Sequence, residues 1–215
     1  MTNFQKRIVT SIIILPLSFF FLIQGGYTLL SFLFTIFFLG TFELFSTFNR
    51  KPTILFLDLI LILSLYSIYF LTESGEIAFS FLLWVIILCI CSDVGGYVFG
   101  KIFKWKKLTK ISPKKTFSGV LGSFIFSLLS LIIINNIIPE TSTLNFFEVK
   151  YFFLAIIFSL VAQVGDLTIS YFKRKEKIKD TGKILPGHGG IFDRIDGLMF
   201  VVIVTIIFYK FNIIP

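Results

Sequence analysis

Long apolar runs limit what this chain can fold into more than any other feature of its sequence. Runs of about 18 or more predominantly apolar residues recur, and each is long enough to cross a hydrocarbon core of about 30 Å. Inside lipid a segment must satisfy its own backbone hydrogen bonds, which a continuous apolar run does as a helix. Charged residues make up only 15% of the chain, against about 25% in soluble proteins. The expected fold class is therefore all-α, a polytopic transmembrane helical protein, rather than a soluble helical core or a membrane β-barrel.

The apolar runs and the breakers between them predict seven spanning helices in a single integral membrane domain, residues 1–215. We place these helices near residues 8–24, 27–48, 53–71, 77–100, 117–138, 151–172 and 193–211. The first run follows two basic residues as in a signal peptide, but it is long and no small-residue cleavage site follows it, so we expect an uncleaved helix. Residues 1–76 form the N-terminal helices, and residues 77–215 carry two basic loops and most of the polar motifs.

Lys and Arg are very unevenly divided between the two ends of these helices. If all seven helices span the membrane, the side that holds the N-terminus carries eighteen Lys or Arg residues. Two of them precede the first helix, two are at residues 50–51, seven at 101–115 and seven at 173–194. The other side holds only Lys150 and Lys210. This bias predicts an N-in, C-out orientation with both basic loops in the cytoplasm. The net charge of +8 then reflects cytoplasmic loops rather than binding to nucleic acid.

Four acidic residues lie within or at the ends of the apolar runs: Glu43, Asp58, Asp93 and Asp166. Ionisable groups at membrane depth are costly, so they are usually paired or functional. For Glu43 and Asp58 two readings stay open. One is a structural pairing with a neighbouring helix or a loop Lys, and the other is the lining of a polar cavity.

A stripe at helical spacings of three and four begins at Asp93 and continues through Gly96, Tyr97, Gly100 and Lys101. Small residues on such a stripe let another helix approach closely, as in small-xxx-small packing. They also leave room for a ligand. The stripe is therefore read either as a packing surface or as the wall of a polar cavity.

The first basic loop contains a Ser-Pro-Lys-Lys-Thr segment, residues 112–116, next to the start of a predicted helix. Basic residues interleaved with aromatic and aliphatic ones are typical of a segment in the headgroup layer. The sharper reading is that Ser112, Lys114 and Lys115 bind phosphate together with the N-terminus of the helix that follows.

The longest polar run, residues 170–196, lies between the last two predicted helices. It holds seven Lys or Arg, three Asp, four Gly and the only His of the chain. Asp166, just before it, shares a helix face with Ser170 and Lys173. The glycines of the segment 185–190 allow backbone amides to approach a phosphate closely. His188 is alone, so it is read as a phosphate donor or a turn residue rather than as a zinc ligand.

Asp193 and Asp196 lie three residues apart at the head of the last predicted helix and so share one face. Such a carboxylate pair can hold Mg²⁺, which takes oxygen ligands and keeps waters for the phosphates of a nucleotide. The alternative is a helix cap that compensates the helix dipole, and the nearby Asp166 and Asp180 favour the metal. Acids for a cation, bases for phosphates and a cavity at membrane depth together predict phosphoryl or nucleotidyl transfer to a lipid.

The stretch 170–196 resembles the signature of the phosphatidate cytidylyltransferases, also called CDP-diacylglycerol synthases. That signature has a Ser, a Lys-Arg pair, a Lys-Asp pair, a small residue, Pro-x-His-Gly-Gly and Asp-Arg-x-Asp. Its fixed positions are all present: Ser170, Lys173, Arg174, Lys179, Asp180, Gly182, Pro186, His188, Gly189, Gly190, Asp193, Arg194 and Asp196. The segments at 93–97 and 112–116 are also similar to the family, so the resemblance covers about residues 93–196.

The resemblance implies an Mg²⁺-dependent nucleotidyltransferase of phospholipid biosynthesis, which makes CDP-diacylglycerol and pyrophosphate from CTP and phosphatidate. It implies a protein of the cell (inner) membrane whose active site faces the cytoplasm. Catalysis is expected to depend on Asp166, Lys173, Arg174, Asp180, Asp193 and Asp196. The metal ligands are expected among the four Asp of that set, and Asp93 either lines the cavity or takes a second cation. Further substrate contacts are expected from Ser112, Lys114, Lys115, Ser170, Lys179, His188, Gly189, Gly190 and Arg194.

Two features depart from the family pattern. Ser118 stands where the family commonly has an acid, and many members have one or two helices more than the seven predicted here. The oligomeric state is left open, with a homodimer among the alternatives. Two other functions also stay open: a CTP-dependent kinase of a lipid alcohol, and a non-catalytic membrane protein that binds or transports anionic lipids. The lack of visible repeats argues against the transporter.

Overall fold

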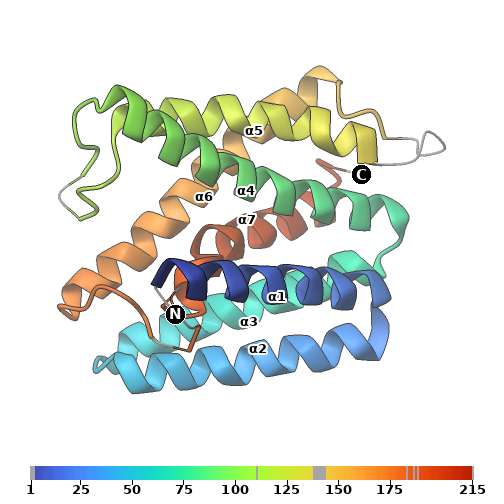
Figure 1. The fold of residues 1–215 in the computed structure, drawn as a ribbon. Coiled ribbons are helices and arrows are strands. Elements are labelled where there is room, and N and C mark those ends of the chain that lie inside the picture. Colours follow the sequence, from blue (N-terminus) through green and yellow to red (C-terminus); the bar gives the residue numbers. More distant parts are fainter. Residues whose placement is uncertain are drawn as a thin grey trace.

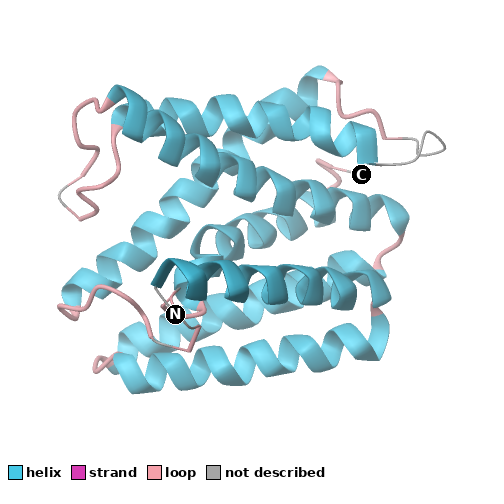
Figure 2. Ribbon diagram, viewed as in Figure 1, coloured by secondary structure: helices cyan, strands magenta, loops and turns pink. Residues whose placement is uncertain are grey.

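The computed structural model describes residues 3–109, 111–137, 144–182, 184–185, 187 and 189–214, with side chains at residue 10 and from residue 12 onward. Within these ranges the chain forms seven α-helices joined by loops (Figure 2): α1 (Asn3–Gln24), α2 (Gly26–Thr47), α3 (Lys51–Glu73), α4 (Glu76–Phe103), α5 (Phe117–Ile137), α6 (Val149–Lys175) and α7 (Phe192–Lys210). All of them lie where the apolar runs predict a helix. The largest differences are that α1 begins five residues earlier, and that α4 and α6 each end three residues later. The all-helical fold is thus confirmed.

Among the described residues, five helices, α2 to α6, are long and apolar enough to cross a membrane. The described apolar part of α1 is shorter, Ile12–Gln24, and α7 begins with charged residues. Large apolar side chains such as Phe38, Phe42 and Phe153 are exposed on the outside of the bundle, where lipid would cover them. The protein is therefore a polytopic integral membrane protein, while the number of spans and the N-in orientation remain predictions.

Helix α7 lies in the interior of the bundle and contacts α3, α4 and α6. Figure 1 shows α4 and α5 running side by side on one side of α7, and α1 to α3 on the other. The loops that follow α2, α4 and α6 lie at one end of the bundle in this view, close to the N-terminal end of α7. The two basic loops thus share one end of the molecule, as the charge distribution predicts.

Glycines hold α4 and α5 in close contact. A Cβ on Gly95 would overlap the carbonyl oxygen of Gly122, and a Cβ on Gly122 would overlap that of Gly95. At the next residue, a Cβ on Gly96 would come within 2.7 Å of Ser123 Oγ. Helix packing is therefore the correct interpretation for Gly96 and Gly100 of the stripe. The interpretation as a cavity wall applies only to Asp93.

This contact gives a first testable prediction. Replacing Gly122 by Val is expected to push α4 and α5 apart and to lower the free energy of unfolding by about 1–3 kcal/mol or more, as overpacking does elsewhere. The loss is measured as a lower melting temperature in detergent. Leu121→Val is the matched control, because Leu121 is the exposed neighbour of Gly122. Equal melting temperatures for the two variants would contradict the role of Gly122.

Candidate active site

Two glycines let α6 and α7 cross closely near the loop end of the bundle. A Cβ on Gly165 would lie 3.0 Å from the carbonyl oxygen of Asp196, and a Cβ on Gly197 would lie 3.1 Å from that of Ala162. A side chain at either position would have to push the helices apart. Because Asp166 follows Gly165 and Asp196 precedes Gly197, the crossing brings these two acids into one region.

Asp93 of α4 lies in the same region as Asp166 and Asp196, because α4 packs against α6 at the neighbouring residue, Ser92. The hydroxyl oxygens of Ser92 and Ser159 are buried and lie 2.8 Å apart. The carboxylates of Asp93, Asp166 and Asp196, here called the carboxylate cluster, lie near enough for their charges to repel one another. Asp93 is exposed and the other two are half-buried, so a ligand can reach the cluster.

The first basic loop folds back onto this cluster. Lys115 Nζ lies 2.6 Å from Asp166 Oδ2, and Ser170 Oγ donates to Asp166 Oδ1 over 3.2 Å. Arg174 Nε donates to the carbonyl oxygen of Ile111 over 3.3 Å and so ties α6 to the same loop. The predicted common face of Asp166 and Ser170 is confirmed, and the pairing of Lys115 with Asp166 links the first basic loop directly to α6.

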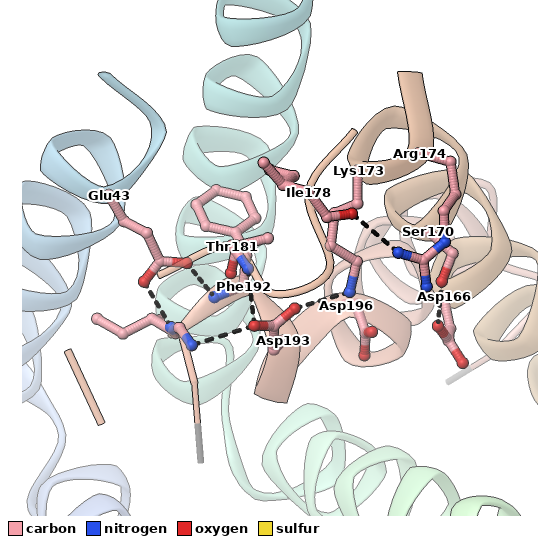
Figure 3. A network of polar contacts seen from close by, with 12 residues as sticks. Glu43, Asp166, Ser170, Lys173, Arg174, Ile178, Thr181, Phe192, Asp193 and Asp196 are labelled. Carbon is pink, nitrogen blue, oxygen red and sulfur yellow. Dashed lines mark hydrogen bonds and ion pairs between the residues drawn. The ribbon is translucent and has the colours of Figure 1, made fainter. Parts of the chain in front are cut away.

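Asp193 anchors the loop between α6 and α7, residues 176–191 (Figure 3). Its Oδ1 lies 2.7 Å from Lys173 Nζ, and its Oδ2 accepts from the amides of Thr181 over 2.9 Å and Gly190 over 3.1 Å. Both side chains of the ion pair are buried, with 10% of Lys173 and 5% of Asp193 exposed. Both oxygens of Asp193 are therefore in use, and the amides that they accept from precede α7, so Asp193 anchors the loop rather than capping the helix.

The amides at the start of α7 are occupied as well. Glu43, from the distant α2, accepts from the amide of Ile191 over 2.7 Å and from that of Phe192 over 3.3 Å. The amide of Gly189 donates to a carbonyl of its own turn over 3.2 Å, and that of Gly190 to Asp193. The sequence predicts that amides of Gly189 and Gly190 cradle a phosphate. In this conformation carboxylates and a carbonyl of the chain itself already take them.

The remaining predicted site residues surround this core. Ser112 is half-buried. Four others are exposed near the loop end: Lys114, Lys179, Asp180 and Arg194. His188 and Pro186 lie outside the described residues. The predicted set of four metal-binding Asp is thus divided, with Asp166 and Asp196 in the carboxylate cluster, Asp180 in the loop, and Asp193 in the first turn of α7 with its contacts to that loop. Ser118, where an acid was expected, is buried, and its Oγ lies 3.0 Å from that of Thr116.

The contact between Glu43 and α7 was not predicted. Its only sequence signal is an acid inside an apolar run, which left two roles open, a structural pairing and the wall of a polar cavity. The pairing is correct, but the partners are backbone amides rather than a loop Lys. Asp58 is also paired, because it accepts from Thr41 Oγ1 over 2.7 Å.

A comparison with protein families bears on this arrangement of acids and bases. The family model described as "Cytidylyltransferase family" matches residues 53–212. The chain belongs to the cytidylyltransferase family. Every described residue of the carboxylate cluster and of the Asp193 anchor falls within the matched range, whereas Glu43 precedes it.

Several curated relatives of this chain are named phosphatidate cytidylyltransferase. The protein of Rickettsia conorii is 39% identical over 129 residues, which cover 56% of each chain. That of Helicobacter pylori is 36% identical over 137 residues, covering 64% of this chain and 48% of the relative. That of Staphylococcus saprophyticus is 37% identical over 133 residues, covering 61% and 50%. The chain spans about half the length of the curated relatives it matches.

Proposed function

We propose that this cytidylyltransferase acts on CTP and phosphatidate, giving CDP-diacylglycerol and pyrophosphate. The observation that carries the proposal is the position of the carboxylate cluster beneath two basic loops. Asp93 lies ten residues before the end of α4, which is about 15 Å along the helix from its loop end. A site at that depth suits a lipid phosphate from the bilayer and a nucleotide from water. The names of the relatives support the same reaction.

In this reaction an oxygen of the phosphatidate phosphate attacks the α-phosphorus of CTP. A new P–O bond forms while the bond to the pyrophosphate breaks, and negative charge grows on the leaving group. Catalysis of this kind depends on positioning and on neutralising charge. Lys114 and Lys179 are exposed at the loop end, where they would bind the phosphates of CTP. Lys115 would exchange its contact with Asp166 for one with a phosphate.

The residues of the cluster fit Mg²⁺, because their donors are all carboxylate oxygens. Mg²⁺ usually binds one or two carboxylates and takes its other ligands from waters and phosphates. Within the described residues no three acidic, Cys or His side chains are placed to hold an ion by themselves, so waters and phosphates would have to supply most of its ligands. Asp166 is held by Lys115 over 2.6 Å, so we assign the ion to Asp93 and Asp196, with Asp166 beside it. When bound, the ion would offset the charge of the phosphates.

The basic loops give the proposed orientation. CTP is a cytoplasmic metabolite, and the positive-inside rule puts the lysine-rich end of the bundle in the cytoplasm. We therefore place the carboxylate cluster on the cytoplasmic side of the inner membrane. A single-cysteine variant at exposed Lys179, labelled with a membrane-impermeant reagent in intact cells and in opened cells, tests this placement. Labelling in intact cells would contradict it.

The reaction is tested with purified protein in detergent, phosphatidate, Mg²⁺ and CTP labelled at the α-phosphorus. Label in a lipid product, with pyrophosphate released, supports the proposal. In a parallel reaction with a lipid alcohol in place of phosphatidate, release of labelled CDP together with the phosphorylated alcohol would instead identify a lipid kinase. No turnover with any divalent cation would leave a binding or transport protein. EDTA-treated protein is the control for metal dependence.

A further inference from the structure

Glu43 is a membrane-embedded acid that the proposed chemistry does not use. It lies on α2, four residues before its end, and is only 1% exposed. Its two oxygens accept from the amides of Ile191 and Phe192, at the start of α7. Ile191 stands at the N-cap position and has no side chain that could cap the helix. Glu43 therefore supplies from another helix the acceptor and the negative charge that the N-terminus of α7 lacks.

The loop between α6 and α7 is shaped around this carboxylate. A Cβ on Gly190 would overlap Glu43 Oε1, and a Cβ on Gly182 would come within 2.9 Å of Glu43 Cδ. These two glycines thus leave the space that the loop needs to close over the side chain. Any side chain at Gly190 would displace Glu43 from the helix end.

The contacts of Glu43 with the amides of Ile191 and Phe192 fix residues that carry the proposed reaction. Asp193 and Asp196 lie in the first turns of α7, directly after the two amides that Glu43 binds. Asp193 in turn holds the buried Lys173 and the loop at Thr181. If the start of α7 unwinds or shifts, the direction of each of these side chains changes with it.

We infer that Glu43 is a positioning residue that locks the N-terminus of α7, and with it Asp193 and Asp196, in the geometry needed for nucleotidyl transfer. This inference rests on the proposed function for its kinetic part. Glu43 acts at a distance from the reacting atoms, so its loss affects the orientation of Asp193 and Asp196 rather than the binding of CTP. Support residues of this kind typically contribute about 10- to 100-fold to activity.

The test replaces Glu43 by Gln, which has the same shape but offers only one acceptor oxygen to the two amides. The kcat is expected to fall about 10- to 100-fold, with the KM for CTP changed less than about threefold. Hydrogen exchange of the peptide that contains residues 189–193 is expected to become faster. Asp58→Asn is the matched control: it removes an acid at similar depth on the neighbouring α3, and Asn can still accept from Thr41. The control should keep both the kcat and the exchange rate of the wild type.

The outcomes distinguish a failure of this inference about Glu43 from a failure of the proposed function. Unchanged kcat in folded Glu43→Gln protein, or a loss shown only as a raised KM, would overturn it. If that variant fails to fold, Glu43→Asp replaces it: the charge stays but the side chain is shorter by one methylene group and reaches one amide, so kcat should fall by a smaller factor. Wild-type kcat in the folded Asp variant would also overturn the inference. If the wild type makes no CDP-diacylglycerol, the proposed function fails, and the exchange rate alone decides whether Glu43 holds α7.

Discussion

Replacing Asp196 by Asn is expected to abolish turnover while the protein still folds and inserts. Asp196 accepts from the amide of Gly197 over 2.9 Å, and Asn can keep that bond. The substitution therefore removes a negative charge from the carboxylate cluster without removing volume. Loss of a metal ligand costs several kcal/mol of transition-state stabilisation, which corresponds to about 1,000-fold or more in kcat.

Two measurements separate this effect from misfolding. The melting temperature in detergent should stay equal to or rise above that of the wild type, because the substitution relieves repulsion with Asp93 and Asp166. Turnover of CTP and phosphatidate should be lost at every Mg²⁺ concentration. Asp58→Asn again serves as the control for an acid-to-amide change at membrane depth. Activity within about tenfold of the wild type in the Asp196 variant would remove Asp196 from the metal assignment.

The helices could be predicted from the sequence because each long apolar run has only one way to satisfy its backbone in lipid. The contact of Asp166 with Ser170 could also be predicted, since a spacing of four residues on a helix fixes which side chains are neighbours. The role of the glycines after Asp93 could not be settled in that way. Packing and ligand binding need the same small residues, and only the position of α5 decides between them.

The contacts between distant segments could not be predicted. Asp193 and Asp196 share a helix face, but helical spacing does not say that Asp193 turns toward Lys173 and the loop amides. Glu43 reaches α7 across 148 residues of sequence, and no spacing rule connects positions so far apart. Within one helix the sequence is therefore informative, whereas the division of the four predicted metal-binding Asp depends on how the helices cross.

The buried pair of Lys173 and Asp193 leads to the second large prediction. Lys173→Met leaves Asp193 buried beside an apolar side chain, with only the amides of Thr181 and Gly190 to stabilise its charge. Breaking a buried ion pair from one side typically costs about 3–5 kcal/mol. We expect a loss of that size in a detergent unfolding titration, together with loss of turnover. Lys150→Gln is the control, because both side chains of the ion pair of Lys150 with Glu148 are about half-exposed, and the pair should contribute about 1 kcal/mol or less.

The double variant Lys173→Met, Asp193→Asn distinguishes a role of Lys173 in stability from a role in catalysis. With no charge left to bury, and with an Asn oxygen still able to accept from a loop amide, most of the lost stability should return. Turnover should not return and should stay below about 1% of the wild type, because the positive charge of Lys173 also acts on Asp196 in the carboxylate cluster. Recovery of stability and turnover together would mean that the pair only holds the loop. In that case Lys173 would leave the set of catalytic residues, and the phosphates of CTP would have to be bound by the exposed lysines at the loop end.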